Sequence, residues 1–140
     1  MKEILGLTEI VKVHGNDKVV EVAAICDTGA TKTSIDKDIA DKLSLGPVIG
    51  RQRVKNPSFD QKIVRPIVAS KIEIKDKVFD VRANIQDRSH MTHKIIIGRD
   101  ILHNNFIVDV SLSHSGYKVE SLKDEETRGF LNSARYVEKE

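Results

Sequence analysis

Apolar and polar positions along the chain alternate in short runs rich in valine and isoleucine, separated by turn-forming residues. This pattern is typical of a β-sheet protein with many turns. Residues 10–13 and 19–25 flank His14-Gly15-Asn16-Asp17, whose residue types favour a turn, and so predict a hairpin. A second hairpin with one buried face is predicted around residues 75–77, because the apolar positions on both sides of them alternate with polar ones.

Two other segments carry helical spacing. Ser34 is a candidate N-cap, and the apolar residues at 35, 39, 40 and 43 predict one short helix that stops at Gly46-Pro47. The uninterrupted run Ile95-Ile96-Ile97 predicts a strand that is buried on both faces and ends at Gly98. Residues 101–106 predict one or two helical turns, followed by a strand at residues 107–110.

Composition indicates one folded domain with a different C-terminal end. The chain has 140 residues, of which 39% are hydrophobic and 31% charged, enough to bury a core. Its net charge of +2 is spread along the sequence, so neither a nucleic acid nor a membrane is expected as a partner. We predict a domain at residues 1–120. Residues 121–140 are highly charged with a thin apolar stripe, which predicts a peripheral helix or a partly disordered tail.

The single cysteine, the lengths of the apolar runs and the first residues bear on the cellular compartment. A single cysteine, Cys26, cannot form an intramolecular disulfide, and no run of about 18 apolar residues is present to cross a bilayer. Residues 1–9 carry acidic side chains and lack the hydrophobic segment of a signal peptide. These features predict a soluble cytoplasmic protein.

The segment most informative about function is the one in which an apolar strand runs directly into Asp27-Thr28-Gly29-Ala30. Gly29 permits a positive φ and a close approach of the backbone, and Asp27 is placed at the end of the strand. An Asp-Thr-Gly tripeptide on its own more often marks a turn whose aspartate accepts an Asx-type hydrogen bond. A catalytic interpretation therefore needs a second element.

That second element is Ile95-Ile96-Ile97-Gly98-Arg99-Asp100-Ile101-Leu102. Together with residues 27–30 it resembles the retropepsin-like aspartic proteases, in which two such segments pack beside each other under the active site. Within that family the chain looks most like stand-alone microbial domains described as ATP-dependent zinc proteases and linked to ATP-grasp peptide ligases. Arg88-Ser89-His90-Met91 matches the Arg-x-x-Met segment of those domains. The resemblance covers residues 18–109.

The resemblance implies a mostly-β fold, a small closed barrel of retropepsin type with one or two short helices, forming one protomer of a two-fold dimer. It implies Asp27 as the catalytic residue. The supporting active-site loops would be formed by Thr28, Gly29, Ala30, Ile96, Ile97 and Gly98. Thr28 would hydrogen-bond across the dimer, and the Gly29 backbone would face the substrate.

The chemistry of such a site requires two carboxylates. Two of them within hydrogen-bond reach cannot both ionise easily, so they share one proton. The ionised member takes a proton from the water that attacks the peptide carbonyl, and the protonated member donates to the developing oxyanion. The chain has one Asp-Thr-Gly and no other acidic residue in a comparable setting, so each of two chains must contribute Asp27. We therefore expect a homodimeric aspartic peptidase with a peptide substrate.

Two departures from the family pattern concern the surroundings of the catalytic residue. Many retropepsins have an acidic residue after the alanine, which can pair with the arginine of the second segment, whereas this chain has Thr31. Arg99 is accordingly a candidate for a structural ion pair with Asp100 or another carboxylate, or for substrate binding. Arg88 is a candidate for the same two roles. The stretch 48–68, at the place of the flap, holds one glycine. Its basic loop would cover the site and favour acidic peptides, or would form a solvated charged face.

Metal and cofactor signals are weak. His90-Met91-Thr92-His93 lacks the glutamate and the four-residue step of a helical His-Glu-x-x-His site, and the chain has no Gly-x-x-x-x-Gly-Lys-Ser/Thr phosphate loop. No metal and no cofactor are therefore expected, and Cys26 is interpreted as a small buried residue. Two alternatives stay open. One is a catalytically silent peptide-binding or dimerisation module with the same barrel, and the other is a metal-dependent peptidase.

Overall fold

The structure is a computed structural model that describes residues 1–55, 62–113 and 134–139. In these residues nine strands and two short helices are present. The strands are β1 (Glu3–His14), β2 (Lys18–Cys26), β3 (Ser34–Asp36), β4 (Val48–Lys55), β5 (Lys62–Ile74), β6 (Lys77–Gln86), β7 (Ile95–Ile97), β8 (Phe106–Ser113) and β9 (Arg135–Glu138). The helices are α1 (Lys37–Lys42) and α2 (Arg99–Leu102). The predicted mostly-β class with short helices is therefore confirmed.

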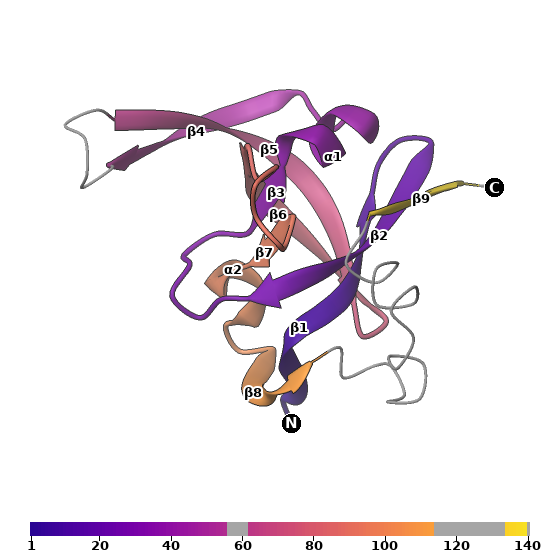
Figure 1. The fold of residues 1–140 in the computed structure, drawn as a ribbon, viewed down its shortest axis with the longest axis vertical. Coiled ribbons are helices and arrows are strands. Elements are labelled where there is room, and N and C mark those ends of the chain that lie inside the picture. Colours follow the sequence, from indigo (N-terminus) through magenta and orange to yellow (C-terminus); the bar gives the residue numbers. More distant parts are fainter. Residues whose placement is uncertain (56–61, 114–133, 140) are drawn as a thin grey trace.

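The sheet closes on itself (Figure 1). Its strands follow the order β5, β6, β3, β7, β2, β1, and β1 pairs in turn with β5 through residues 12–14, which completes a ring. The long strand β1 also pairs in parallel with β8. Closure removes most of the free strand edges that would otherwise pair with other chains.

Both predicted hairpins are present. β1 and β2 pair antiparallel across the turn at residues 15–17, and β5 and β6 pair antiparallel across Lys75 and Asp76. These two residues have φ values of 52° and 64°, as a tight type I′ turn between twisted strands requires. The turn is therefore fixed by local backbone geometry as well as by the strands.

The first predicted helix begins later than its sequence pattern suggested. Residues 34–36 form the short strand β3, which lies between β6 and β7, and α1 starts only at Lys37. Pairing on both sides outweighs the local capping preference of Ser34. Ile39 and Leu43 are buried as predicted, and the helical turn and strand expected after residue 100 are confirmed as α2 and β8.

Two further expectations need correction. The basic stretch after Gly46 was expected to be an exposed loop; its described residues are largely exposed, but they form the antiparallel hairpin β4–β5. Of the C-terminal segment at 121–140, the described part does not form a helix or a disordered tail, because residues 135–138 form β9 on the edge of β2. The free backbone groups of that edge explain the pairing. Residues 121–133 and 140 lie outside the described residues.

The ring encloses one apolar core. Its largest fully buried side chains are Leu5, Ile35, Ile39, Leu43, Ile72, Ile74, Ile95, Ile97 and Ile101. β7 contributes Ile95 and Ile97 to this core, whereas Ile96 is only half-buried on the opposite face, so the prediction of burial on both faces is wrong for this strand. Among the described residues, no helix is long and apolar enough to span a membrane.

Candidate active site

The loop that follows β2 holds Asp27 at the surface by its backbone. Asp27 is half-buried, and its N–H donates to the Ile97 carbonyl at 2.9 Å, which continues the pairing of β2 with β7. Its Oδ1 accepts the Gly29 N–H at 2.8 Å, and the Ala30 N–H donates to its carbonyl at 3.2 Å. Thr28 and Gly29 are exposed. The carboxylate is therefore oriented by the chain while part of it faces solvent.

The Asx-type hydrogen bond of the simpler interpretation is thus present. It engages one carboxylate oxygen, and it also orients the group as a catalytic carboxylate requires, so the bond alone does not separate the two interpretations. Gly29 does not adopt the expected positive φ, which among the described glycines occurs only at Gly46. A Cβ at Gly29 would lie 3.2 Å from Asp27 Oδ1. Glycine at this position serves the close approach of the loop to its own aspartate.

The second segment lies directly against this loop. β7 pairs in parallel with the end of β2, and the Arg99 N–H donates to the Ala30 carbonyl at 2.8 Å. A Cβ at Gly98 would lie 2.5 Å from the carbonyl carbon of Lys32, which is backbone and cannot move aside cheaply. The structure therefore brings residues 27–33 and 95–102 together in the arrangement that the resemblance implied.

Thr33 and Asp100 fasten the two segments to each other. The Thr33 N–H donates to Asp100 Oδ2 at 3.0 Å, and the Thr33 hydroxyl donates to Asp100 Oδ1 at 2.7 Å. The same hydroxyl oxygen accepts the Gly98 N–H at 3.2 Å. Asp100 Oδ1 also accepts the Ile101 N–H at 3.0 Å. Asp100 thus acts as a structural acceptor, and the sequence reasoning missed its partner Thr33.

Arg99 has a neutral partner. Its Nη2 donates to Thr31 Oγ1 at 3.1 Å, so the residue at the place of the family's acidic side chain still binds the arginine. Within the described part of the chain, no carboxylate lies within 4.0 Å of the Arg99 guanidinium, and Asp100 is engaged by Thr33 instead. The exposed Arg99 charge therefore remains available beside the Asp27 loop.

Arg88 is buried, and the charge of Asp27 acts on its guanidinium. Its Nε donates to the His93 carbonyl at 2.9 Å, and its backbone N–H donates to Asp36 Oδ1 at 2.7 Å. Burial lowers the pKa of the Arg88 guanidinium, Asp36 opposes that shift, Arg65 adds to it and Asp27 opposes it. Arg88 is 6% exposed and keeps its positive charge, as arginines in proteins do.

The segment 87–94 that carries Arg88 is held by one ammonium group. Lys94 Nζ donates to three carbonyls of the segment, those of Arg88 at 3.0 Å, Ser89 at 2.9 Å and Met91 at 3.1 Å. The Asp36 N–H in turn donates to the Lys94 carbonyl at 2.9 Å. Sequence reasoning missed Asp36 and Lys94, because neither periodicity nor a motif distinguishes them from surface charges.

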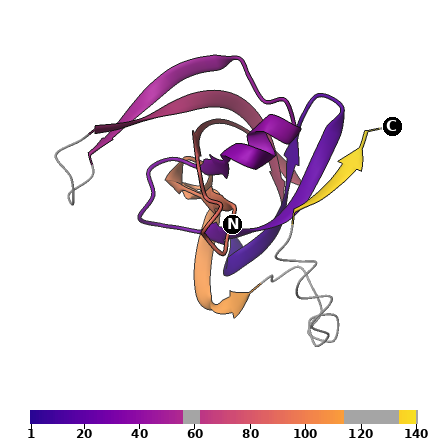
Figure 2. The ribbon, with the colours of Figure 1, turned by 45° about the horizontal axis from the view of Figure 1, so that its top comes forward.

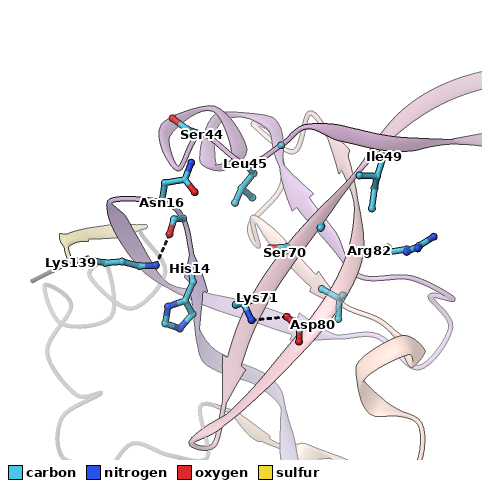
Figure 3. A pocket seen from close by; sticks show the side chains of 14 residues that line it. His14, Asn16, Ser44, Leu45, Ile49, Ser70, Lys71, Asp80, Arg82 and Lys139 are labelled. Atoms are coloured by element: carbon cyan, nitrogen blue, oxygen red, sulfur yellow. Dashed lines mark hydrogen bonds and ion pairs between the residues drawn. The ribbon is translucent and has the colours of Figure 1, made fainter.

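The hairpin β4–β5 projects on the same side of the ring as the loop 27–33. This arrangement is visible in both views, in which the hairpin extends from the top of the ring and the purple loop that follows β2 bulges below it (Figure 1, Figure 2). The hairpin is the stretch that the resemblance assigns to the flap. Its tip, residues 56–61, lies outside the described residues.

Metal-ligating side chains and the thiol of Cys26 are two further candidates for chemistry near Asp27. Among the residues that the structure describes, no three His, Cys, Asp or Glu side chains gather as metal ligands. Cys26 is buried, and burial, together with the charge of Glu9, raises the pKa of its thiol to about 12. A neutral buried thiol is not a nucleophile at physiological pH.

Comparison with known proteins identifies a family in the sequence. The family model described as "gag-polyprotein putative aspartyl protease" matches residues 11–104, which is more than half of the chain and includes both segments of the site. No curated protein matches the chain.

Solved structures resemble the chain at low sequence identity. Protein Lpg0085 of Legionella pneumophila, of unknown function (DUF785), is similar with a TM-score of 0.55 and 21% identity over 84% of this chain and 100% of that chain. A retropepsin-like aspartic protease from Rickettsia conorii has a TM-score of 0.47 and 17% identity over 71% and 75% of the two chains. EIAV protease, complexed with the inhibitor HBY-793, has a TM-score of 0.46 and 19% identity over 69% and 85%. The Legionella structure supports the fold.

Proposed function

The chain belongs to the gag-type aspartyl protease family, and from this premise we propose that it is an aspartic peptidase that uses two Asp27 carboxylates of a homodimer. The observation that carries the proposal is the oriented, half-exposed carboxylate of Asp27 on a loop fastened to the Gly98-Arg99-Asp100 segment.

The proposed reaction follows from the pairing of two carboxylates. One Asp27 is ionised and removes a proton from the attacking water, and the other is protonated and donates to the carbonyl oxygen. The tetrahedral intermediate then collapses, the peptide C–N bond breaks, and a proton passes to the leaving amine. Each chain supplies one half of this acid–base pair.

Two features support a dimer. The Asp27 loop exposes Thr28 and Gly29, which would lie near a two-fold axis. Strand β8 and the start of β1 also expose large apolar side chains that a second copy would cover: Ile4, Ile107, Val110 and Leu112.

Arginine side chains around the site favour an acidic peptide as the substrate. Arg99 is exposed and binds a neutral threonine, and Arg65 on β5 adds its positive charge to that of the buried Arg88. A peptide with carboxylate side chains would neutralise charges that the described protein groups leave unpaired.

The narrower kinship with microbial domains linked to ATP-grasp ligases stays a hypothesis carried by Arg88-Ser89-His90-Met91. It would make acidic peptides assembled by a ligase the natural substrates. A panel of peptides that differ only in the number of acidic residues tests this: turnover should rise with acidic content, and equal turnover across the panel would contradict it.

The decisive test replaces Asp27 with asparagine. Asp27→Asn keeps the Oδ1 that accepts the Gly29 N–H and removes the proton-sharing carboxylate, so hydrolysis should be lost while the melting temperature stays near that of the wild type. Asp109→Asn is a matched control, because Asp109 Oδ1 accepts the Ser111 N–H at 2.9 Å in the same Asx geometry. Undiminished turnover by Asp27→Asn would refute the aspartic mechanism.

A mixing experiment tests the dimer. Excess Asp27→Asn chains should inhibit the wild type by forming mixed dimers, and activity should fall faster than linearly on dilution through the dissociation range. A monomer with full specific activity would refute the shared site. Peptide binding without turnover by the wild type at any pH would instead favour the catalytically silent module.

A further inference from the structure

Three side chains form a chain of hydrogen bonds that runs from the buried core to the half-buried Gln52 of the hairpin. The Ser34 hydroxyl donates to Asn84 Oδ1 at 2.7 Å, and Asn84 Nδ2 donates to Gln52 Oε1 at 3.0 Å. The Asn84 N–H also donates to the Thr33 carbonyl at 3.0 Å. Ser34 is 4% exposed and Asn84 3% exposed. An amide buried to this degree loses free energy if either end is left without a partner.

These residues join three elements with different roles. Ser34 begins β3, directly after the Asp27 loop and next to Thr33, which fastens that loop to Asp100. Asn84 lies on β6, opposite Ser34 in the ladder, and Gln52 lies on β4, the outer strand of the hairpin. The chain of bonds therefore runs from the rim of the candidate active site to the hairpin.

The position of Gln52 identifies the face of the hairpin that is turned toward the site. It stands directly opposite Arg65 in the β4–β5 ladder, and residues directly opposite share one face of a sheet. Arg65 contributes to the electrostatic environment of Arg88, which is itself within reach of Asp27. Gln52 and Arg65 therefore belong to the inner face of the hairpin, and Arg51 and Arg53 to the outer face.

We propose that Asn84 is a positioning residue that holds Gln52, and with it the inner face of the β4–β5 hairpin, against the strand that leaves the Asp27 loop. The functional part of this inference rests on the proposed peptidase. With the bond to Gln52 in place, Arg65 is presented to the substrate before it arrives, so less conformational freedom is lost on binding. Without the bond, the hairpin samples positions from which Arg65 does not face the site.

The test removes the acceptor without touching the core. Gln52→Met has similar length and no acceptor oxygen, so Asn84 Nδ2 loses its partner. Gln52→Glu is the conservative variant, because its carboxylate accepts the same bond. Arg51→Met is the matched control, since it changes the neighbouring residue of β4 on the outer face. All three substitutions lie on the hairpin, where folding of the ring is not at stake.

Hydrogen exchange of the full chain measures how readily the β4–β5 hairpin opens. In Gln52→Met, amides of β4 and the paired part of β5 should exchange about fivefold to tenfold faster than in the wild type, as the loss of one hydrogen bond with a buried partner predicts. Gln52→Glu and Arg51→Met should exchange like the wild type. Unchanged exchange in Gln52→Met, or equal acceleration in Arg51→Met, would overturn the proposal.

Steady-state kinetics measure the effect of the same variants on KM and kcat for a peptide substrate. Gln52→Met should raise KM for an acidic peptide about fivefold to tenfold with kcat nearly unchanged, and Arg51→Met should leave both constants near those of the wild type. A fall in kcat alone, or an equal rise of KM in Arg51→Met, would contradict a positioning role. If the wild type hydrolyses no peptide, the peptidase proposal fails, whereas the exchange measurement still decides whether Asn84 holds the hairpin.

Discussion

Replacing Thr33 by valine should destabilise the fold, because one hydroxyl serves both segments of the candidate site. Its proton goes to Asp100 Oδ1 at 2.7 Å, and its oxygen accepts the Gly98 N–H at 3.2 Å. Valine keeps the shape and removes both bonds. The Gly98 N–H is then buried without an acceptor, which costs about 2 kcal/mol. Asp100 Oδ1 keeps the Ile101 N–H, so its lost bond adds about 1 kcal/mol.

The expected sum of about 3 kcal/mol corresponds to a fall in melting temperature of roughly 10 °C for a chain of this size. Urea unfolding followed by circular dichroism measures the free energy of unfolding directly. Thr31→Val is the matched control: its exposed hydroxyl accepts one bond from Arg99, and its removal should cost well under about 1 kcal/mol. A Thr33→Val protein within about 0.5 kcal/mol of the wild type would refute this account of the two segments.

Three further results are expected. Gly98→Ala should lower the free energy of unfolding by about 2 kcal/mol or more, because the new Cβ would lie 2.5 Å from the Lys32 backbone. Gly50→Ala is the control and should lower it far less, because the Cβ there would lie 3.7 Å from the nearest atom. Equal unfolding free energies of the two variants would contradict the close approach at Gly98. Cys26, with its pKa raised to about 12, should resist a thiol reagent at pH 8 in the native protein and react after unfolding, and rapid native labelling would contradict its burial. Peptide hydrolysis should be fastest below pH 7, where a carboxylate dyad holds one proton, and a rate still rising above pH 8 would count against the dyad.

The sequence predicted the elements whose pattern is local. Both hairpins and the strand at residues 95–97 carry alternating or continuous apolar positions that are typical of a sheet. The meeting of residues 27–33 with residues 95–102 could be inferred as well, but only from the resemblance to a family. No periodicity links two segments so far apart in the chain.

What the sequence did not predict depends on partners that are distant in the chain. Ser34 reads locally as a helix cap and becomes a strand residue because β6 and β7 flank it. Thr33, Asp36 and Asn84 are ordinary polar residues in the sequence, and only burial against a specific partner gives them their roles. The expected partner of Arg99 was an acid, whereas the hydroxyl of Thr31 takes that place.

The attachment of β9 to β2 bears on the order in which the molecule assembles. The six strands that close the ring all lie within residues 3–97, so a growing chain contains the whole ring before residues 135–138 are synthesised. β9 then adds to an edge more than a hundred positions upstream, through four register pairs, and closes a very long loop. Closing so long a loop costs more conformational entropy than closing the hairpins, so we expect β9 to pair after the ring has formed. The edge of β2 at residues 18–21 is thus uncovered in the nascent protein until residues 135–138 have been made.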